Sequence, residues 1–375
     1  MKTITDPIGL YVHIPFCLKK CDYCDFCSFP SSVGLSRDAY INSLCAEIRS
    51  YEKGKIAVDS VFFGGGTPSI LSGCEFKRIT DAIYESFLVK SGAEFTLEAN
   101  PKTLTEENLK AYLESGVNRV SLGLQTIHEN ELKKLGRVHS FDDFLSTYEL
   151  VRRLGVKNVS IDLMYGIPEQ TKASFGETLK RVIELSPEHI SVYGLIIEDG
   201  TRLARHLSDY AIPTENEECD MYYLASDMLN ENGYMHYEIS NYAKQGFTCD
   251  HNLKYWRDME YIGVGIAAYS YFNGKRFGNS RDFDAYVRDF SSSREFDEKI
   301  DTDENRFEFA MLALRLSEGF SLKEYKARFG IDFLKGKESL AKRLCEAGLL
   351  GIENDRIFLT EKGFYVSNSI LSELL

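Results

Sequence analysis

The chain has 375 residues, of which 57 are acidic and 44 basic, giving a net charge of −13 at pH 7. This length allows one large domain and a smaller one, and the acidic balance disfavours nucleic acid, which is bound by clustered Lys and Arg. No run approaches the roughly 20 apolar residues of a membrane span, and Met1–Pro7 lacks the basic and apolar regions of a signal peptide. Its nine cysteines are then expected to be reduced thiols and metal ligands, in a cytoplasmic protein without a transmembrane segment.

Short β-branched or aromatic runs alternate with longer amphipathic runs in residues 1–200, which predicts βαβ units and a parallel sheet. Six such units favour an α/β fold of the partial (β/α)6, TIM-like kind, although a doubly wound sheet fits the same pattern. The predicted strands are Gly9–Ile14, Asp59–Phe63, Glu94–Glu98, Arg119–Leu124, Asn158–Met164 and His189–Ile196. The predicted helices between them are Arg37–Tyr51, Glu75–Val89, Glu106–Ser115, Phe141–Leu154 and Ser174–Leu185.

Three cysteines, Cys17, Cys21 and Cys24, stand on the short segment that follows the first predicted strand. Three thiolates from one tight loop can hold three irons of a 4Fe-4S cubane and leave the fourth iron free to bind a small molecule. A structural zinc site is the alternative, because Cys27 could supply a fourth thiolate and His13 a nitrogen. Zinc ligands usually come as two Cys-x2-Cys pairs a dozen or more residues apart, so this spacing favours the cluster.

Glycines and polar residues follow the carboxyl ends of the other predicted strands, where parallel α/β folds carry their sites. A Gly-Gly-Gly-Thr-Pro run at 64–68 could let the backbone approach a ligand closely. Glu98 and Asp162 are carboxylates in apolar strands, where a ligand hydroxyl or ammonium, or a protein cation, could satisfy them. Gln125 and Arg137 add a neutral amide and a fixed cation. Each of these residues has a structural explanation by itself, but together they predict one binding rim.

From residue 201 onward the β/α alternation weakens. A long helix is predicted over Glu215–Glu231, a loop over Cys249–Trp256, and a buried strand or close-packed turn over Glu260–Tyr271. A polar linker is predicted near residue 300, where Ser291–Ser293 and an acidic run occur. Beyond it, the order of predicted elements resembles a winged helix: Arg306–Leu316, Leu322–Phe329, Phe333–Ala347, a hairpin over Gly348–Leu359 and a last helix from Glu361.

We therefore expect three parts: a barrel core at 1–200, a barrel-associated extension at 201–300 and a helical, winged-helix-like domain at 301–375. Within the extension, His251 stands close to Tyr255 and Trp256. An imidazole beside flat aromatic side chains could bind the iron of a porphyrin. Histidines that only complete local hydrogen bonds are far commoner than heme ligands, so these residues alone leave both explanations open.

Seven motifs follow one another along the chain: Tyr11–Cys17, the three cysteines, Gly-Gly-Gly-Thr-Pro, Glu98-x-Asn100-Pro101, Ser121–Gln125, Leu135–Arg137 and Asp162–Pro168. This ordered set resembles the oxygen-independent coproporphyrinogen III oxidase family of radical S-adenosylmethionine (SAM) proteins, over nearly the whole length of the chain.

Within that family, three features are more similar to the HemW-type heme chaperones than to the oxidase. Only ten residues precede Tyr11, whereas the oxidase has a long N-terminal extension. Phe26 stands where the oxidase has a fourth cysteine. The segment His251–Trp256 is similar to a His-Asn-x-x-Tyr-Trp element that is associated with heme binding in the chaperones.

The resemblance implies a 4Fe-4S cluster on the three cysteines, whose open iron binds SAM and whose electron cleaves it to a 5'-deoxyadenosyl radical. It implies SAM contacts from Tyr11, Tyr23, Gly65, Gly66, Thr67, Glu98, Gln125, Arg137 and Asp162, and a heme element of His251, Asn252, Tyr255 and Trp256. Two residues depart from the pattern, since Cys27 replaces a residue that is not a ligand and Glu169 replaces a glycine.

The function implied is that of a chaperone that binds heme as its cargo and passes it to a heme-accepting protein, such as one of the respiratory chain. An electron donor such as flavodoxin or ferredoxin and a homodimeric assembly belong to the same expectation. The alternative is the oxidase reaction, in which a propionate side chain of coproporphyrinogen III is decarboxylated. A third hypothesis, a zinc-stapled winged-helix regulator, is opposed by the acidic charge.

Overall fold

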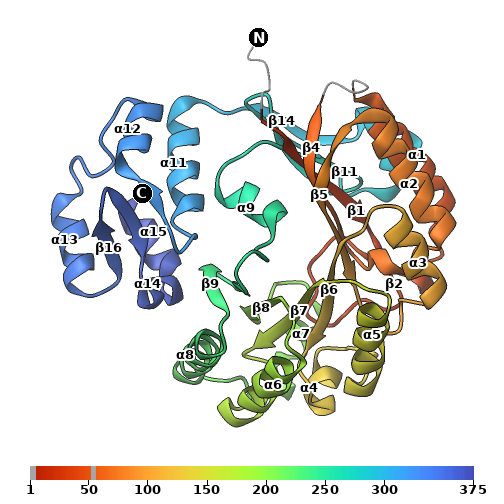
Figure 1. Cartoon of the computed structure of the whole chain (residues 1–375), viewed down its shortest axis with the longest axis horizontal. Helices are drawn as coiled ribbons and strands as arrows, with labels where there is room; N and C mark the ends of the chain where they lie inside the picture. Colours follow the sequence, from red (N-terminus) through yellow and green to blue (C-terminus); the bar gives the residue numbers. More distant parts are fainter. Residues whose placement is uncertain (1–5, 52–55) are drawn as a thin grey trace.

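The computed structural model describes residues 6–51 and 56–375 (Figure 1). Most of Met1–Pro7, the stretch searched for a signal peptide, lies outside the described residues. The described part is built on one large mixed sheet with the strand order β14-β13-β12-β11-β1-β4-β5-β6-β7-β8-β10-β9. None of its described helices is both long enough and apolar enough to span a bilayer.

Six parallel strands form the centre of this sheet in the same order in space as in the chain. A doubly wound sheet would reverse direction beside its first strand, so this order excludes that alternative and confirms the partial barrel. Among the described strands the curved sheet does not close, because β14 and β9 are its two edges. The six strands are β1 (Ile8–Ile14), β4 (Ala57–Gly65), β5 (Leu88–Ala99), β6 (Arg119–Gln125), β7 (Asn158–Tyr165) and β8 (His189–Gly194).

Helices on the outer face of the sheet begin at side-chain caps that the sequence encodes. Ser72 and Glu75 form a reciprocal capping box at the start of α2, and Ser140 and Asp143 form one at the start of α5. Figure 1 shows α1, α2, α3 and α5 on one side of the sheet and α9 on the other. The outer helices are α1 (Arg37–Ser50), α2 (Gly73–Ser86), α3 (Glu106–Glu114), α4 (Glu129–Lys134), α5 (Phe141–Arg153), α6 (Lys172–Leu185) and α8 (Glu215–Glu231).

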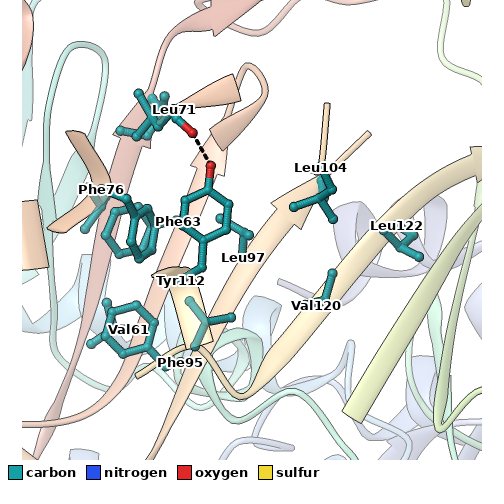
Figure 2. Packing of buried hydrophobic residues seen from close by; sticks show 14 of the residues in the cluster. Val61, Phe63, Leu71, Phe76, Phe95, Leu97, Leu104, Tyr112, Val120 and Leu122 are labelled. Carbon is teal, nitrogen blue, oxygen red and sulfur yellow. Dashed lines mark hydrogen bonds between the residues drawn. The ribbon is translucent and has the colours of Figure 1, made fainter. Parts of the chain in front are cut away.

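The main hydrophobic core lies between these helices and the sheet. Phe63 of β4 and Phe76 of α2 are both fully buried, with ring centroids 4.5 Å apart, and Tyr112 of α3 packs on Phe76 at the same distance. Figure 2 shows the Tyr112 hydroxyl donating a hydrogen bond to the backbone oxygen of Leu71, which satisfies the one polar atom of that ring. This packing fixes the helices and leaves the opposite, concave face of the sheet free to carry polar side chains.

The two edges of the sheet come from the region where the predicted alternation weakens. Glu260–Tyr271, expected as a strand or a turn, supplies β11 (Tyr261–Val264), which is parallel to β1, and the start of β12 (Tyr269–Phe272). The remaining edge strands are antiparallel to their neighbours. They are β13 (Lys275–Asn279), β14 (Arg294–Lys299), β9 (Met235–Glu238) and β10 (Asn241–Ala243), and the short helices of this part are α7 (Arg202–Arg205) and α10 (Phe283–Arg288).

One predicted loop is wrong, because Asp250–Trp256 form a helix, α9. Its Cys249 N-cap offers no side-chain cap, which is why the sequence gives no helix signal. The free N–H groups are satisfied from distant elements instead: Cys249 N donates to the Tyr237 hydroxyl at 3.2 Å, and His251 N donates to the Glu94 carboxylate at 3.0 Å. Tertiary partners thus replace the local cap.

The C-terminal part has its own hydrophobic core, which includes Phe320, Tyr325, Ile357 and Phe364. Five helices and a small three-stranded sheet make up this part among the described residues, in the order that the winged-helix pattern predicts. The elements are α11 (Thr302–Ala313), β15 (Phe320–Ser321), α12 (Leu322–Phe329), α13 (Glu338–Glu346), β16 (Leu350–Glu353), β17 (Arg356–Leu359), α14 (Glu361–Tyr365) and α15 (Ser367–Leu374).

The bounds of three predicted helices differ from the structure by three residues or more at one end. The helix expected over Glu75–Val89 ends at Ser86, because the next residues pair with β4 as the first part of β5. The helix expected over Arg306–Leu316 is α11, which Asp301 caps and which therefore starts earlier, at Thr302. The helix expected from Phe333 begins only at Glu338, since a turn with Gly336 at φ +81° precedes it.

Candidate functional site

A cavity of about 410 Å³ opens at the carboxyl ends of the parallel strands. It lies where the sequence predicts the binding rim, because the loops that follow parallel strands meet at one edge of the sheet. The predicted site residues that line it are Cys17, Cys21, Tyr23, Cys24, Gly65, Gly66, Thr67, Glu98, Gln125, Arg137 and Asp162.

Of the three predicted cluster ligands, Cys17 is the last residue of the short strand β2 (Phe16–Cys17), and Cys21 and Cys24 lie between β2 and the parallel strand β3 (Phe29–Pro30). Cys24 N donates to the backbone oxygen of Cys21 at 3.2 Å, which closes a tight turn, and the Thr67 hydroxyl donates to the Cys17 sulfur at 3.5 Å. Burial raises the pKa of the Cys17 and Cys24 thiols. Because iron binds thiolates, loading a cluster on this loop would release protons.

Cys27 does not line the cavity, and its sulfur contacts the backbone oxygen of Arg281 at 3.9 Å. The cavity is thus lined by three cysteines and not by four. In the described ranges, no three His, Cys, Asp or Glu side chains are arranged to hold a single metal ion. A cubane takes each thiolate on a different iron, so its fit to this loop rests on the number of cysteines and on the cavity that they share.

Two carboxylates line the cavity from the strands on either side of β6, Glu98 from β5 and Asp162 from β7. Burial and the charge of Asp162 raise the pKa of Glu98 to about 8, although Gly65 N donates to its Oε2 at 3.2 Å. Burial also raises the pKa of Asp162, which accepts hydrogen bonds from the Ser121 hydroxyl at 3.0 and 3.1 Å. Two buried like charges are costly without a cation, so this end of the cavity suits a positively charged ligand.

Arg137 supplies the opposite charge at the rim. Its Nη1 donates to Asn100 Oδ1 at 2.5 Å and its Nη2 to the Tyr23 hydroxyl at 2.9 Å. Its Nε is buried and has no hydrogen-bond partner in the structure. A buried donor without a partner is destabilising, and a ligand carboxylate would satisfy it.

Gln125 adopts a left-handed backbone conformation, with φ +73°. Its side-chain oxygen accepts a hydrogen bond from the Tyr193 hydroxyl at 3.0 Å, which orients the amide. Backbone strain of this kind persists where the surroundings hold it and is frequent at binding sites.

Some cavity residues escaped the sequence prediction. Asn100, Ser121 and Met164 stand inside the motifs but received no role, and Tyr193 was not singled out. Tyr193 lies at the carboxyl end of β8, so the strand-end rule that identified the other residues could also have found it.

The predicted SAM residue Tyr11 is absent from the cavity lining. Its hydroxyl is 3.0 Å from His13 Nδ1, and His13 Nε2 is 2.8 Å from the backbone oxygen of Cys27. Burial lowers the pKa of His13 to about 4, so this imidazole is neutral and holds the cysteine segment against β1. Tyr11 therefore contacts the cysteine segment only through His13, outside the cavity.

The predicted heme element is separate from this cavity. His251 is 1% exposed, its Nδ1 lies 3.0 Å from the Ser60 hydroxyl and its Nε2 lies 2.7 Å from the Tyr255 hydroxyl. Burial lowers the pKa of His251 to about 3. Both ring nitrogens thus have partners, and the role of His251 in heme binding stays a prediction.

Comparison with known proteins gives the family. Residues 11–182 match the radical SAM superfamily, and residues 300–366 match the HemN C-terminal domain. The chain is 36% identical to the heme chaperone HemW of Lactococcus lactis, over 98% of this chain and 97% of that protein. The chain belongs to the HemW family.

Other relatives agree with this assignment, which is to the chaperones rather than to the oxidase. The heme chaperone HemW of Bacillus subtilis is 35% identical over 97% of this chain and 98% of its own length. Among solved structures, the coproporphyrinogen III oxidase HemN of Escherichia coli superposes with a TM-score of 0.83 over 98% of this chain and 90% of that one. At 22% identity, the similarity to HemN shows a shared fold.

Proposed function

We propose that this member of the HemW family is a heme chaperone, which binds heme as cargo and delivers it to a hemoprotein. The observation that carries the proposal is the 36% identity to a curated heme chaperone over 98% of the chain. The exposed side chain of Phe26 supports it, because Phe26 lines the mouth of the cavity at the position where the oxidase is expected to have a cysteine.

In this proposal Cys17, Cys21 and Cys24 hold a 4Fe-4S cluster, and SAM binds in the cavity beside it. When bound, the cluster supplies an open iron and an electron to SAM. The chain itself supplies the charges: Glu98 and Asp162 line the cavity and would balance the cationic groups of SAM, and Arg137, which also lines it, would balance the carboxylate. Gly66 lets the end of β4 pack closely against the start of the cysteine segment, since a Cβ at Gly66 would lie 2.8 Å from the backbone oxygen of Phe16, and Gly65 and Gly66 both line the cavity without side chains.

The proposal also includes partners and organisation. It places the protein in the cytoplasm, with a heme-accepting protein as its client and a flavodoxin or ferredoxin as its electron donor, and it admits a homodimer. It divides the chain into a barrel core at 1–200, an extension at 201–300 and a C-terminal domain at 301–375.

Anaerobic incubation of the iron-loaded protein with SAM, a reductant and coproporphyrinogen III tests the function. We expect no vinyl product, and we expect heme to stay with the protein through gel filtration. Formation of the vinyl product would contradict the proposal and favour the oxidase reaction.

A further inference from the structure

A groove of about 440 Å³ adjoins the cavity at the strand ends and follows the cysteine segment. Cys21 and Cys24 line both the groove and the cavity, whereas Cys17 lines the cavity but not the groove. The cysteine segment thus separates the two spaces. A cluster bound to its thiols is therefore approached from the groove as well as from the cavity.

The two walls of this groove are remote in the sequence but are held together by the backbone. One wall is the cysteine segment, and the other is the short helix α7 with the turn before it. Leu203 N of α7 donates to the backbone oxygen of Asp22 at 2.7 Å, and the Leu203 side chain is buried. Thr201 caps α7 by accepting a hydrogen bond from Ala204 N at 3.2 Å. These contacts fix the two walls relative to each other.

The groove is basic, although the whole chain has a net charge of −13. Four cations and two carboxylates line it: Lys19, Lys20, Arg202 and Arg205, with Asp22 and Asp25. A local excess of positive charge on an acidic protein creates a field that attracts acidic partners to that place.

The cations of the groove are largely free to interact with a partner. Arg202 lies 3.7 Å from Asp22, but its side chain is 61% exposed. The side chains of Lys19 and Arg205 are exposed and have no hydrogen-bond or ion-pair partner among the described residues. Exposed charges at the rim of an interface steer association and select the partner.

The position of the groove indicates what kind of partner it fits. In the proposed function the cluster gives an electron to SAM, so a reductant from outside must replace that electron. The reductant has to come close to the cluster without entering the space that SAM fills, and the groove meets this condition through Cys21 and Cys24. Electron-transfer complexes of proteins have small interfaces, below about 1,200 Å², so a groove of this size is sufficient.

We propose that this groove is the docking surface for a small acidic electron carrier, whose carboxylates face Lys19, Arg202 and Arg205. The inference rests on the proposed function and adds the surface to which the electron donor binds. In the transfer the carrier is oxidised by one electron and the cluster is reduced by one. No bond forms or breaks, and no proton passes between the two proteins.

Binding of a flavodoxin with a net negative charge to the full-length, iron-loaded protein tests this surface. The double variant Arg202→Glu and Arg205→Glu reverses two charges of the groove and alters no side chain that lines the first cavity. The double variant Lys180→Glu and Arg181→Glu is the matched control, because it changes the net charge equally on α6, outside the groove.

Two measurements are made on each protein. Isothermal titration calorimetry gives the affinity for flavodoxin at low and at high salt. Stopped-flow absorbance under anaerobic conditions gives the rate at which reduced flavodoxin reduces the cluster. Dithionite at high salt serves as a small reductant that needs no docking surface.

We expect the groove variant to bind flavodoxin about tenfold more weakly, or worse, at low salt. The difference should shrink at high salt, because the Debye length falls from about 10 Å at 0.1 M to about 3 Å at 1 M. The rate of reduction by flavodoxin should fall by a similar factor, whereas the rate with dithionite should equal that of the wild type. Iron content and SAM affinity should be unchanged, and the control variant should behave as the wild type.

Wild-type affinity and reduction rate in the groove variant would overturn the docking surface. Equal losses in the groove and control variants would also overturn it, because net charge alone would then explain them. If the double variant does not fold or loses iron, unchanged flavodoxin affinity in the single variant Arg205→Glu overturns it instead. Heme retention, measured separately on the wild type, decides on the proposed function.

Discussion

The two ends of the barrel interior are both lined by buried polar side chains, yet they differ in what satisfies those side chains. At the carboxyl ends of the strands, Glu98 has its pKa raised to about 8 and Arg137 keeps a free buried Nε beside an open cavity. Deeper in the concave face, helix α9 fills the space, and Glu94 accepts hydrogen bonds from Asp250 N and His251 N, both at 3.0 Å.

This difference teaches that burial of polar groups does not by itself mark a ligand site. His251 is only 1% exposed, but the fold supplies partners for both of its ring nitrogens, whereas the fold leaves Arg137 Nε for something else to satisfy. We call the cavity at the carboxyl ends of the strands the upper end, and the part filled by α9 the lower end. Substitutions at the upper end are therefore expected to change ligand affinity, and substitutions at the lower end to change mainly the stability of the fold.

The largest effect is expected within the cysteine segment. Cys24→Ala removes one of the three thiolates at the cavity and should abolish iron and sulfide binding. Cys27→Ala, only three residues away, should keep the full iron content, because Cys27 does not line the cavity. Iron and sulfide analysis after anaerobic reconstitution measures the effect of both variants. Loss of iron in Cys27→Ala would show that the cluster has four cysteine ligands and would contradict the prediction.

The next largest effect concerns the lower end. Glu94→Gln leaves the buried Arg119 without its carboxylate, 4.0 Å away, and weakens the cap of α9. We expect a loss of about 3–5 kcal/mol in the free energy of unfolding, the usual cost of removing one partner of a buried pair. Denaturant unfolding measures it. Glu85→Gln, in the exposed pair with Arg49, is the control and should cost less than about 1 kcal/mol.

Arg137→Ala tests the upper end, where a loss of ligand affinity rather than of stability is expected. It should weaken SAM binding about tenfold to a hundredfold, since hydrogen bonds to charged groups contribute about 1.5–3 kcal/mol. Iron content should remain intact, because Arg137 touches none of the three thiols by a described hydrogen bond. Isothermal titration calorimetry gives the affinity; an unchanged value would remove the carboxylate contact from the proposal.

The raised pKa of Glu98 predicts a pH dependence of binding. The ligand-free carboxyl is protonated below about 8, so binding a cationic ligand there must release a proton. SAM affinity should rise by up to about tenfold per pH unit from pH 6 to 8 and level off above. In Glu98→Gln this slope should vanish. A slope that persists in Glu98→Gln would assign the proton to another group.

The same pKa affects the stability of the ligand-free protein. Because the folded-state pKa of Glu98 is raised from 4.5 to about 8, its contribution to stability is full below about 4.5 and is lost as the pH rises to about 8. Unfolding curves over this range, compared with Glu98→Gln, measure that loss without any cofactor.

The smallest effect is expected for Tyr193→Phe. This change removes only the hydroxyl that donates to Gln125 at 3.0 Å, so SAM affinity should fall by about 0.5–1.5 kcal/mol, or roughly two- to tenfold. Stability should hardly change, because the ring keeps its packing. An affinity equal to that of the wild type would show that the Gln125 amide needs no orienting partner.

Much of the upper site could be predicted, because its residues obey rules that act along the chain. The cysteine spacing and the polar residues at strand ends identify side chains whose positions follow from the strand order. Tyr193 was missed although it obeys the same rule, and Tyr11 was expected in the cavity although it lies beneath it. Alternation along a strand does not tell how deep in the barrel an inward-facing side chain stands.

The lower end and a second cavity could not be predicted in this way. Helix α9 has no cap of its own and depends on Glu94 and Tyr237, which are far away in the sequence. The second cavity, of about 370 Å³, is lined by residues of β11 to β14 and of α11, so it forms only when these strands lie side by side and α11 packs over them. No periodicity in the sequence predicts such contacts between distant elements.

The sequence by itself determined the family, the partial barrel, the three cysteines that line the cavity and the edge of the sheet where that cavity lies. These depend on local patterns: caps, hydrophobic periods and the spacing of reactive side chains. Only the tertiary structure decided which buried polar groups keep an unsatisfied atom, that His251 is enclosed, and that a second cavity exists. Those properties depend on distances between residues remote in the chain, and a linear pattern does not contain them.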